Sequence, residues 1–437
     1  MGFFYDLFMN IIDDLYKSYL KHPKITTDSR QDVNGSIFFG IKGERFDGNK
    51  FAGDAISNGA VMAVVDDPEM RGEKIMTVKN SLLTLQELAS FHRSQLDIPI
   101  LGLTGSNGKT TTKELIASVL AKKYRVAYTK GNLNNHIGVP LTLLDIDHSH
   151  EIAVVEMGAN HVGEIAQLCN IARPAYGLIT NIGKAHLEGF GGFEGVVKAK
   201  TELYKYILAN GGTVFVNTDH LLLDELSKKI PRITYGSMPQ ADCHAKIAES
   251  FSCVKIKWEN VKGEQLIRSN LFGAFNFENI VAAICVGNFF RIEEKHIKEV
   301  IESYHPSNNR SQIIRAKNNT IIMDAYNANP TSMESGLRQF AASGYQRKAV
   351  VLGDMLELGQ YCDAEHQAIL QLLDELKFER TILVGDSFCR NNNKFICFEK
   401  SEDAAKHLAD NPIKDATIYI KGSRGIGLEK VLPALKI

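Results

Sequence analysis

The segment whose residue types suggest the clearest chemistry is 104–112, which reads Thr-Gly-Ser-Asn-Gly-Lys-Thr-Thr-Thr. It lies between an apolar strand pattern at 99–103 and a helix pattern at 111–120. In such a turn, glycines let the backbone approach an anion and the first amides of the helix point at it. Lys109 supplies a positive charge and Thr110 a hydroxyl for Mg²⁺. The pattern predicts a nucleoside triphosphate site made by Gly105, Ser106, Asn107, Gly108, Lys109, Thr110 and Thr111.

This segment is a variant of the P-loop pattern, because Leu103 stands where the first of the two usual glycines would fall and Gly105 is the additional glycine. A glycine-rich turn with an exposed lysine would explain the same residues without a ligand. The coincidence of strand, glycines, lysine, hydroxyls and helix favours the phosphate site.

Three further residues in the central third of the chain could take part in chemistry, and each lies at the end of a strand pattern or within a helix pattern. Glu156 comes directly after an apolar strand pattern, where a carboxylate could hold Mg²⁺ beside the triphosphate or could cap a helix. His186 lies just past the strand pattern 177–180, and a lone histidine of this kind can be functional or purely structural. Lys200 lies in a helix pattern, which by itself indicates a solvated lysine.

The last third and the helix before it contain polar groups at similar positions. Asp324 ends a strand pattern, where an acid often accepts ribose hydroxyls, although the asparagine-rich loop after it could simply cap a helix. Asn276 and Asn279 have the spacing that places both on one helix face, or they could cap that helix. The tail 421–425 presents two cations either to an anionic ligand or to solvent.

Length and pattern predict three α/β domains to hold these residues. A chain of 437 residues is long enough for about three domains. We expect a small N-terminal α/β domain at 1–97 and a central P-loop domain with a mostly parallel sheet at 98–306. A C-terminal Rossmann-like domain with a doubly wound sheet should follow at 307–437. The central domain contains a hairpin-like stretch at 241–270, and the C-terminal domain has four strand patterns, at 320–323, 349–352, 381–384 and 417–420.

Composition excludes several classes of protein. The net charge is −1, so the chain lacks the excess of basic residues that most nucleic-acid-binding proteins have. No apolar run reaches the ~18 residues of a membrane span, and the N-terminus has no signal-peptide pattern. Its apolar residues at Leu7, Ile11, Leu15 and Tyr19 predict an amphipathic helix packed on a domain. Seven cysteines without CxxC spacing indicate reduced thiols and a cytoplasmic protein.

Five segments together resemble the Mur ligases of bacterial cell-wall synthesis, and the likeness covers nearly the whole chain. They are 27–30 with 38–48, 104–112, 131–140 (Gly-Asn-Leu-Asn-Asn-His-Ile-Gly-Val-Pro), 155–160 (Val-Glu-Met-Gly-Ala-Asn) and 324–330 (Asp-Ala-Tyr-Asn-Ala-Asn-Pro). The last, supported by 353–359, is typical of the branch that adds D-alanyl-D-alanine to a UDP-N-acetylmuramoyl-tripeptide. The resemblance implies that these two molecules are the partners, that ATP phosphorylates the peptide carboxylate, and that the amine of the dipeptide attacks the resulting acyl phosphate.

The resemblance also implies roles for individual residues. Lys109 would hold the β and γ phosphates, and Lys200 matches a lysine that the family carries as a carbamate. The metal ligands for two Mg²⁺ ions would be Thr110, Glu156, His186 and carbamylated Lys200. ATP would further contact Asn276, Asn279, Arg310 and Asp324. The substrates would contact Ser29, Arg30, Asn134, Asn135, Tyr326, Asn327 and Asn329. We expect a monomer.

Two other functions fit parts of the sequence. A sister Mur ligase or a folylpolyglutamate synthase, which adds a single amino acid, would differ in the segment 324–330. A P-loop ATPase or kinase-like module would bind ATP without forming an amide. ADP release that depends on both co-substrates distinguishes the ligase from this last class.

Overall fold

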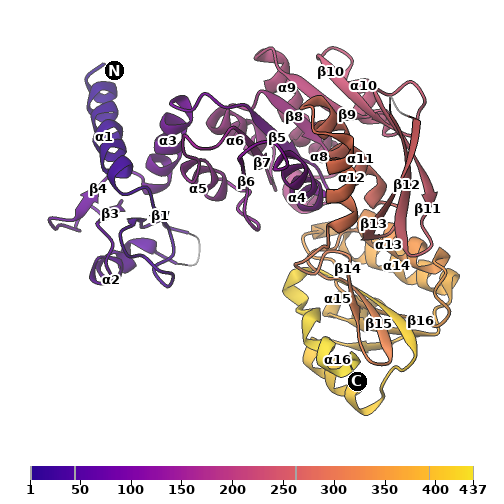
Figure 1. The fold of residues 1–437 in the computed structure, drawn as a ribbon. Coiled ribbons are helices and arrows are strands. Elements are labelled where there is room, and N and C mark those ends of the chain that lie inside the picture. The colour runs from indigo at the N-terminus through magenta and orange to yellow at the C-terminus, as the bar shows by residue number, and fades with distance from the viewer. Residues whose placement is uncertain (1, 44–45, 261–262, 393, 437) are drawn as a thin grey trace.

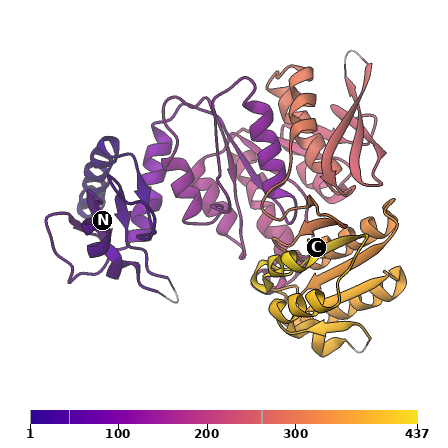
Figure 2. The same cartoon turned by 60° about the horizontal axis from the view of Figure 1, so that its bottom comes forward.

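A computed structural model describes residues 2–43, 46–260, 263–392 and 394–436. Three sheets follow one another along the chain, and the α/β architecture with three parts is as predicted (Figure 1). The N-terminal part lies at one end of the molecule, and the C-terminal part packs against the far side of the central part (Figure 2). Among the described residues, no helix combines the length and apolarity needed to cross a membrane.

The N-terminal part is a four-stranded parallel sheet flanked by helices. Its strands are β1 (Ile25–Thr26), β2 (Ile37–Phe39), β3 (Met62–Val65) and β4 (Ile75–Thr77), in that order. Its helices are α1 (Gly2–Lys21), η1 (Gly48–Phe51), α2 (Ala52–Ser57) and α3 (Ser81–Ser94). Leu15 and Tyr19 of α1 are buried, as the helical spacing predicts. The side chain of Leu7, and Glu44 and Arg45 of the segment 38–48, lie outside the described residues.

The central part is a nine-stranded sheet in the order β13-β12-β11-β10-β9-β8-β5-β7-β6. The strands are β5 (Ile100–Thr104), β6 (Val126–Tyr128), β7 (Ile152–Glu156), β8 (Tyr176–Ile179), β9 (Thr213–Asn217), β10 (Arg232–Gly236), β11 (Cys243–Glu249), β12 (Cys253–Asn260) and β13 (Gly263–Phe272). The strands from β6 to β11 run parallel, and β12 is antiparallel to both of its neighbours. The predicted hairpin is therefore a three-stranded extension of the main sheet.

Helices cover both faces of the parallel strands. The helices are α4 (Lys109–Leu120), α5 (Gly138–Leu144), α6 (Glu164–Ala172), α7 (Leu187–Phe190), α8 (Phe193–Lys200), α9 (Glu202–Ala209), α10 (Leu221–Ser227), α11 (Asn276–Phe289) and α12 (Glu294–Ser303). Alternate residues of β5 enter two different cores: Ile100 packs with α5 and α6, whereas Leu101 and Leu103 pack with α4 and α11. Because both faces are buried, β5 and β7 read as continuous apolar runs. Helix α3 packs on α5 and α6 and so joins the N-terminal part to the central part.

The C-terminal part is a six-stranded sheet in the order β14-β15-β19-β16-β17-β18. Its strands are β14 (Gln312–Arg315), β15 (Asn319–Asp324), β16 (Lys348–Gly353), β17 (Arg380–Val384), β18 (Ile396–Phe398) and β19 (Ala416–Lys421). Its helices are α13 (Pro330–Ala342), η2 (Gly359–Tyr361), α14 (Cys362–Leu376), α15 (Asp386–Asn391), α16 (Ser401–Asp410), η3 (Arg424–Ile426), η4 (Leu428–Val431) and α17 (Leu432–Leu435). The four predicted strands form its parallel centre, and β14 adds an antiparallel edge.

One expectation about the cysteines is wrong. Cys389 and Cys397 form a disulfide, whereas the spacing of the seven cysteines predicts only reduced thiols. The two residues are eight positions apart, and the short helix α15 followed by β18 brings them together. The other five cysteines are free, as expected.

Candidate functional site

The phosphate loop lies between β5 and α4 and is shaped by two glycines. Gly105 has φ +146° and Gly108 has φ +77°, conformations that side chains larger than hydrogen rarely adopt. A Cβ atom on Gly105 would lie 1.9 Å from Thr180 Oγ1, and one on Gly108 would lie 2.4 Å from Asn279 Oδ1. The glycines are therefore required by φ and by close neighbours.

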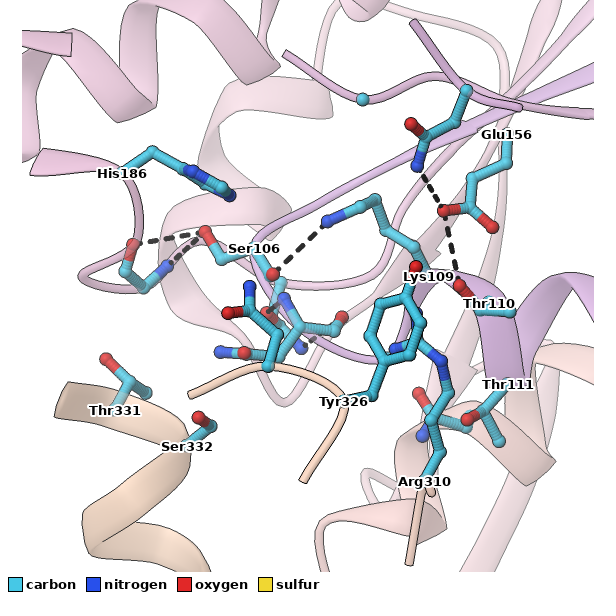
Figure 3. A pocket seen from close by; sticks show the side chains of 18 of the residues that line it. Ser106, Lys109, Thr110, Thr111, Glu156, His186, Arg310, Tyr326, Thr331 and Ser332 are labelled. Carbon is cyan, nitrogen blue, oxygen red and sulfur yellow. Dashed lines mark hydrogen bonds between the residues drawn. The ribbon is translucent and has the colours of Figure 1, made fainter. Parts of the chain in front are cut away.

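A cavity of about 690 Å³ lies at this loop (Figure 3). Its lining residues come from the chain both before and after Pro306. From the central part come residues of the phosphate loop, of the segments 132–136 and 156–160, of the segment after β8, and of α11. From the C-terminal part come Arg310, Ser311, Asp324, Tyr326, Asn327, Thr331, Ser332, Ser335, Glu357, Lys421 and Arg424. Polar side chains from two sheets thus face one another across a single cavity.

Strand register places Glu156 beside the phosphate loop. Leu103 of β5 pairs with Glu156, the last residue of the neighbouring strand β7. Glu156 Oε1 accepts a hydrogen bond from Asn134 Nδ2 at 2.7 Å and one from Thr110 Oγ1 at 3.3 Å. Its other carboxylate oxygen is buried and has no hydrogen-bond partner among the described residues. The predicted neighbours Thr110 and Glu156 are therefore brought together.

Lys113 is a charged neighbour of Glu156 that the sequence analysis missed. Its Nζ lies 3.6 Å from Glu156 Oε2, and both side chains are almost completely buried, 0% and 1% exposed. The ammonium makes no hydrogen bond within the described part of the chain. Burial lowers the pKa of Lys113, and the charge of Glu156 partly opposes that shift. The sequence spacing could have pointed to Lys113, because it follows Lys109 by four residues and so lies on the same helix face.

Lys109 points back into its own loop. Its Nζ donates to the carbonyl oxygens of Gly105 at 2.8 Å and Ser106 at 3.3 Å. Burial lowers its pKa, with Glu156 opposing the shift and the Arg310 charge adding to it. An anion in the cavity would meet this ammonium and the amides at the start of α4 together.

Lys200 is buried rather than solvated, so the pattern-based reading of a solvated helix lysine is wrong. Its side chain is 1% exposed, and Nζ lies 5.2 Å from the centre of the Phe190 ring. Burial, and next the nearby Lys109 charge, lower its pKa to about 7. Periodicity could not show this, because the burying surface comes from other segments.

His186 faces the C-terminal part. Its Nδ1 contacts Glu357 Oε2, and this imidazole lowers the pKa of Glu357. In Figure 3 His186 and Glu156 lie on opposite sides of Lys109. Within the described residues, no group of three or more His, Cys, Asp or Glu side chains could hold a metal ion. Of the predicted metal ligands, Thr110 and Glu156 are in hydrogen-bond contact. His186 and Lys200 both lie against the ring of Phe190.

The two predicted adenine-binding amides are joined in a buried chain. Asn276 Nδ2 donates to the carbonyl oxygen of Phe272 at 2.7 Å, and Asn279 Nδ2 donates to Asn276 Oδ1 at 2.8 Å. Thr112 Oγ1 donates to Asn279 Oδ1 at 2.9 Å. Both amides line the cavity, and their hydrogen bonds also hold α11 against α4. Between them, Glu278 lines the cavity too, and burial raises its pKa to about 7.

The C-terminal side of the cavity is held by charged and aromatic contacts. Asp324 Oδ2 accepts from Lys421 Nζ at 2.6 Å and from Tyr419 OH at 3.1 Å, and Oδ1 accepts from the Ser311 amide at 3.0 Å. The Arg310 guanidinium stacks 3.6 Å from the Tyr326 ring centre. Lys421 of the tail segment therefore orients the predicted ribose ligand, a role that its position at the end of β19 could have suggested.

The remaining predicted substrate residues fall into two places. Asn134, Asn135, Tyr326 and Asn327 line the cavity, and Asn329 bridges the two sheets by donating from Nδ2 to Asn107 Oδ1 at 2.8 Å. Ser29 and Arg30 lie in the N-terminal part and are not among the residues that line the cavity. Arg30 instead pairs with Asp28 at 2.8 and 2.9 Å and lowers the pKa of that carboxyl to about 2.

The fold and the site define a P-loop nucleotide-binding enzyme with a second sheet facing the phosphate loop. Three family models match successive parts of the chain: "Mur ligase family, catalytic domain" at 23–93, "Mur ligase middle domain" at 103–287 and "Mur ligase, glutamate ligase domain" at 309–424. The chain belongs to the Mur ligase family.

Relatives of known sequence and structure agree with this membership. The UDP-N-acetylmuramoyl-tripeptide--D-alanyl-D-alanine ligase of Bacillus subtilis is 32% identical, with 97% of each chain covered. The crystal structure of MurF from Acinetobacter baumannii matches with a TM-score of 0.85 and 31% identity over 94% of this chain and 93% of that one. The MurF ligase of Thermotoga maritima, solved in complex with ADP, matches with a TM-score of 0.83 and 27% identity over 94% and 97%.

Proposed function

We propose that this chain is the ATP-dependent ligase that joins D-alanyl-D-alanine to the peptide carboxylate of a UDP-N-acetylmuramoyl-tripeptide. The observation that carries the proposal is the phosphate loop facing the segment 324–330 across one cavity. The proposal is further supported by relatives that are named for this reaction and that match this chain over nearly their whole length. A related structure that holds ADP supports it too.

The reaction needs a leaving group on the peptide, because a carboxylate is a poor electrophile. The γ-phosphoryl group of ATP moves to a carboxylate oxygen, and ADP leaves. The neutral amine of D-alanyl-D-alanine then attacks the acyl carbon and loses a proton as the amide forms. The C–O bond to phosphate breaks, and inorganic phosphate carries the electron pair away. Lys109 and the α4 amides stabilise the charge on the transferring group, while Arg310 meets the nucleotide from the opposite sheet.

Thr110 and Glu156 fit a Mg²⁺ ion by their chemistry. A carboxylate and a hydroxyl are the hard oxygen ligands that this ion prefers, and in the part of the chain that the structure describes, Glu156 Oε2 has no hydrogen-bond partner. Mg²⁺ bound there would neutralise phosphate charge. We propose His186 and a carbamylated Lys200 as the holders of a second ion.

Carbamylation of Lys200 requires a neutral amine, which attacks CO₂ and then loses a proton. The lowered pKa near 7 supplies that amine at neutral pH. The product is an anionic oxygen ligand in place of an ammonium. Its negative charge would also be attracted by the nearby Lys109.

We further propose that the N-terminal part binds the UDP end of the substrate and that the C-terminal part binds the dipeptide. Ser29 and Arg30 would contact the former, and Asn134 and Asn135 the part nearer the phosphate loop. Tyr326, Asn327 and Asn329 would lie beside the incoming amine. We expect the enzyme to act as a monomer in the cytoplasm.

A coupled assay of ADP release tests the function. We expect ADP only when ATP, Mg²⁺, UDP-N-acetylmuramoyl-tripeptide and D-alanyl-D-alanine are all present. Single amino acids should not replace the dipeptide, and tripeptides that differ at the third residue would show which peptide is accepted. Lys109→Ala should abolish the signal, whereas Lys122→Ala, which changes an outer lysine paired with Glu299, should keep it. ADP release indifferent to the dipeptide would refute the ligase and favour an ATPase or kinase.

A further inference from the structure

The segment 180–188, which follows β8 and includes the first two residues of α7, touches the phosphate loop on one side. Thr180 Oγ1 donates to the Asn107 carbonyl oxygen at 2.6 Å, and Asn181 Oδ1 accepts from the Asn107 amide at 3.0 Å. Ser106 Oγ accepts from the Gly183 amide at 3.0 Å. These bonds fix the segment to two consecutive residues of the loop, so its position follows the position of the loop.

The same segment touches the C-terminal part on its other side. Lys184 Nζ donates to Glu365 Oε1 at 2.6 Å, and the Lys184 amide donates to Thr331 Oγ1 at 3.0 Å. Glu365 lies in the first turn of α14, where the helix dipole favours a carboxylate, and its side chain is only 15% exposed. Gly183 leaves room for this approach, since a Cβ atom there would lie 3.0 Å from Thr331 Oγ1.

We infer that Lys184 and Glu365 are positioning residues that hold the C-terminal sheet in register with the phosphate loop. Neither Lys184 nor Glu365 is among the described residues that line the cavity. The pair therefore acts through the segment 180–188 and α14. The inference rests on the proposed function, because the amine bound by one part must reach an acyl phosphate formed beside the other. A displacement of about 1 Å between reacting groups can cost on the order of a hundredfold in rate.

The chemistry of the pair suits a reversible latch, that is, an ion pair between the two parts that can form and break. Lys184 belongs to the central part and Glu365 to the C-terminal part, and the lysine side chain is 53% exposed, so water can solvate it when the pair separates. Reversing one charge turns attraction into repulsion at a contact of 2.6 Å, whereas reversing both restores attraction. Interdomain alignment should therefore depend on the product of the two charges.

The test is a charge-swap series measured by ADP release with D-alanyl-D-alanine varied. We expect Lys184→Glu and Glu365→Lys each to raise KM for the dipeptide about fivefold or more, and the double variant to return to within about twofold of the parent. Glu365→Gln should give an intermediate rise without placing a cation at the start of α14. Lys430→Glu is the matched control, because Lys430 pairs with Glu402 at the same 2.6 Å within the C-terminal part. It should leave KM unchanged.

X-ray scattering in the presence of ATP and Mg²⁺ gives a readout independent of turnover. The single reversals should increase the radius of gyration, and the double variant should restore it. Parental KM and radius in both single variants would overturn the inference, as would a folded double variant that repairs neither. If the parent protein releases no ADP in response to the dipeptide, the proposed function fails, and the scattering series still decides whether the latch exists.

Discussion

Lys113 and Glu156 form a buried pair of opposite charges beside the phosphate loop. Lys113→Met should lower the free energy of unfolding by about 3–5 kcal/mol, because Glu156 would keep a buried charge without its nearest cation. The double variant Lys113→Met with Glu156→Gln should recover most of this loss. Urea denaturation of the two single variants, Lys113→Met and Glu156→Gln, and of the double variant measures it. A single variant as stable as the parent, or a double variant worse than the sum, would show that the pair is not coupled.

Lys200 allows a prediction with a defined pH dependence. Burial holds the pKa of Lys200 at about 7 in the folded protein, far below the usual pKa of a lysine, so the neutral amine is gained as pH rises through 7. With bicarbonate present, carbamylation should increase between about pH 6 and 8 and disappear below that range. Mass spectrometry under gentle conditions should show the extra carboxyl on metal-free protein. Lys198, exposed on the same helix, is the control and should stay unmodified at every pH in this range.

At the scale of elements, the turn from β5 into α4 depends on Gly108 for two separable reasons, its positive φ and the close approach of Asn279. Gly108→Ala should abolish nucleotide binding in calorimetry, because its Cβ would strike Asn279 and disturb the contact between α4 and α11. Gly211→Ala isolates the backbone term, since Gly211 has φ +68° and open space around it. That control should lose about 1–2 kcal/mol of stability and keep its nucleotide affinity. Equal affinities in the two variants would contradict the role of the close contact.

At the scale of the whole molecule, the central part lies between the N-terminal sheet and the C-terminal part (Figure 1), whose residues line one side of the cavity. A substrate with a nucleotide at one end and a peptide at the other could reach from the N-terminal sheet to the cavity. Arg30→Ala should therefore raise KM for UDP-N-acetylmuramoyl-tripeptide about tenfold, as expected for one lost charged hydrogen bond, and leave ATP affinity unchanged. Lys24→Ala is the control, because Lys24 makes a similar pair with Asp32 in the same part. A change in ATP affinity, or none in either constant, would argue against this arrangement.

Local patterns were sufficient for much of this protein. The order of the three sheets, the four central strands of the C-terminal sheet, and the phosphate loop follow from runs of apolar residues, glycine positions and helix periodicity. Glu156 could be placed beside Thr110 because parallel strands present their carboxyl ends at one edge. These features depend on neighbours within a few residues, or on a topology that short-range pattern already restricts.

Other features could not be predicted from periodicity. They are the short edge strands β14 and β18, the disulfide of Cys389 with Cys397, and the burial of Lys113 and Lys200. The edge strands and the disulfide join segments that are close in the chain, whereas the burial of the two lysines arises from surfaces that meet only after the sheets have packed. The pairing of Lys184 with Glu365, 181 residues away, belongs to the same class. Chemistry could therefore be predicted from residue types, whereas desolvation and domain alignment required the tertiary structure, because both are set by what surrounds a residue in space.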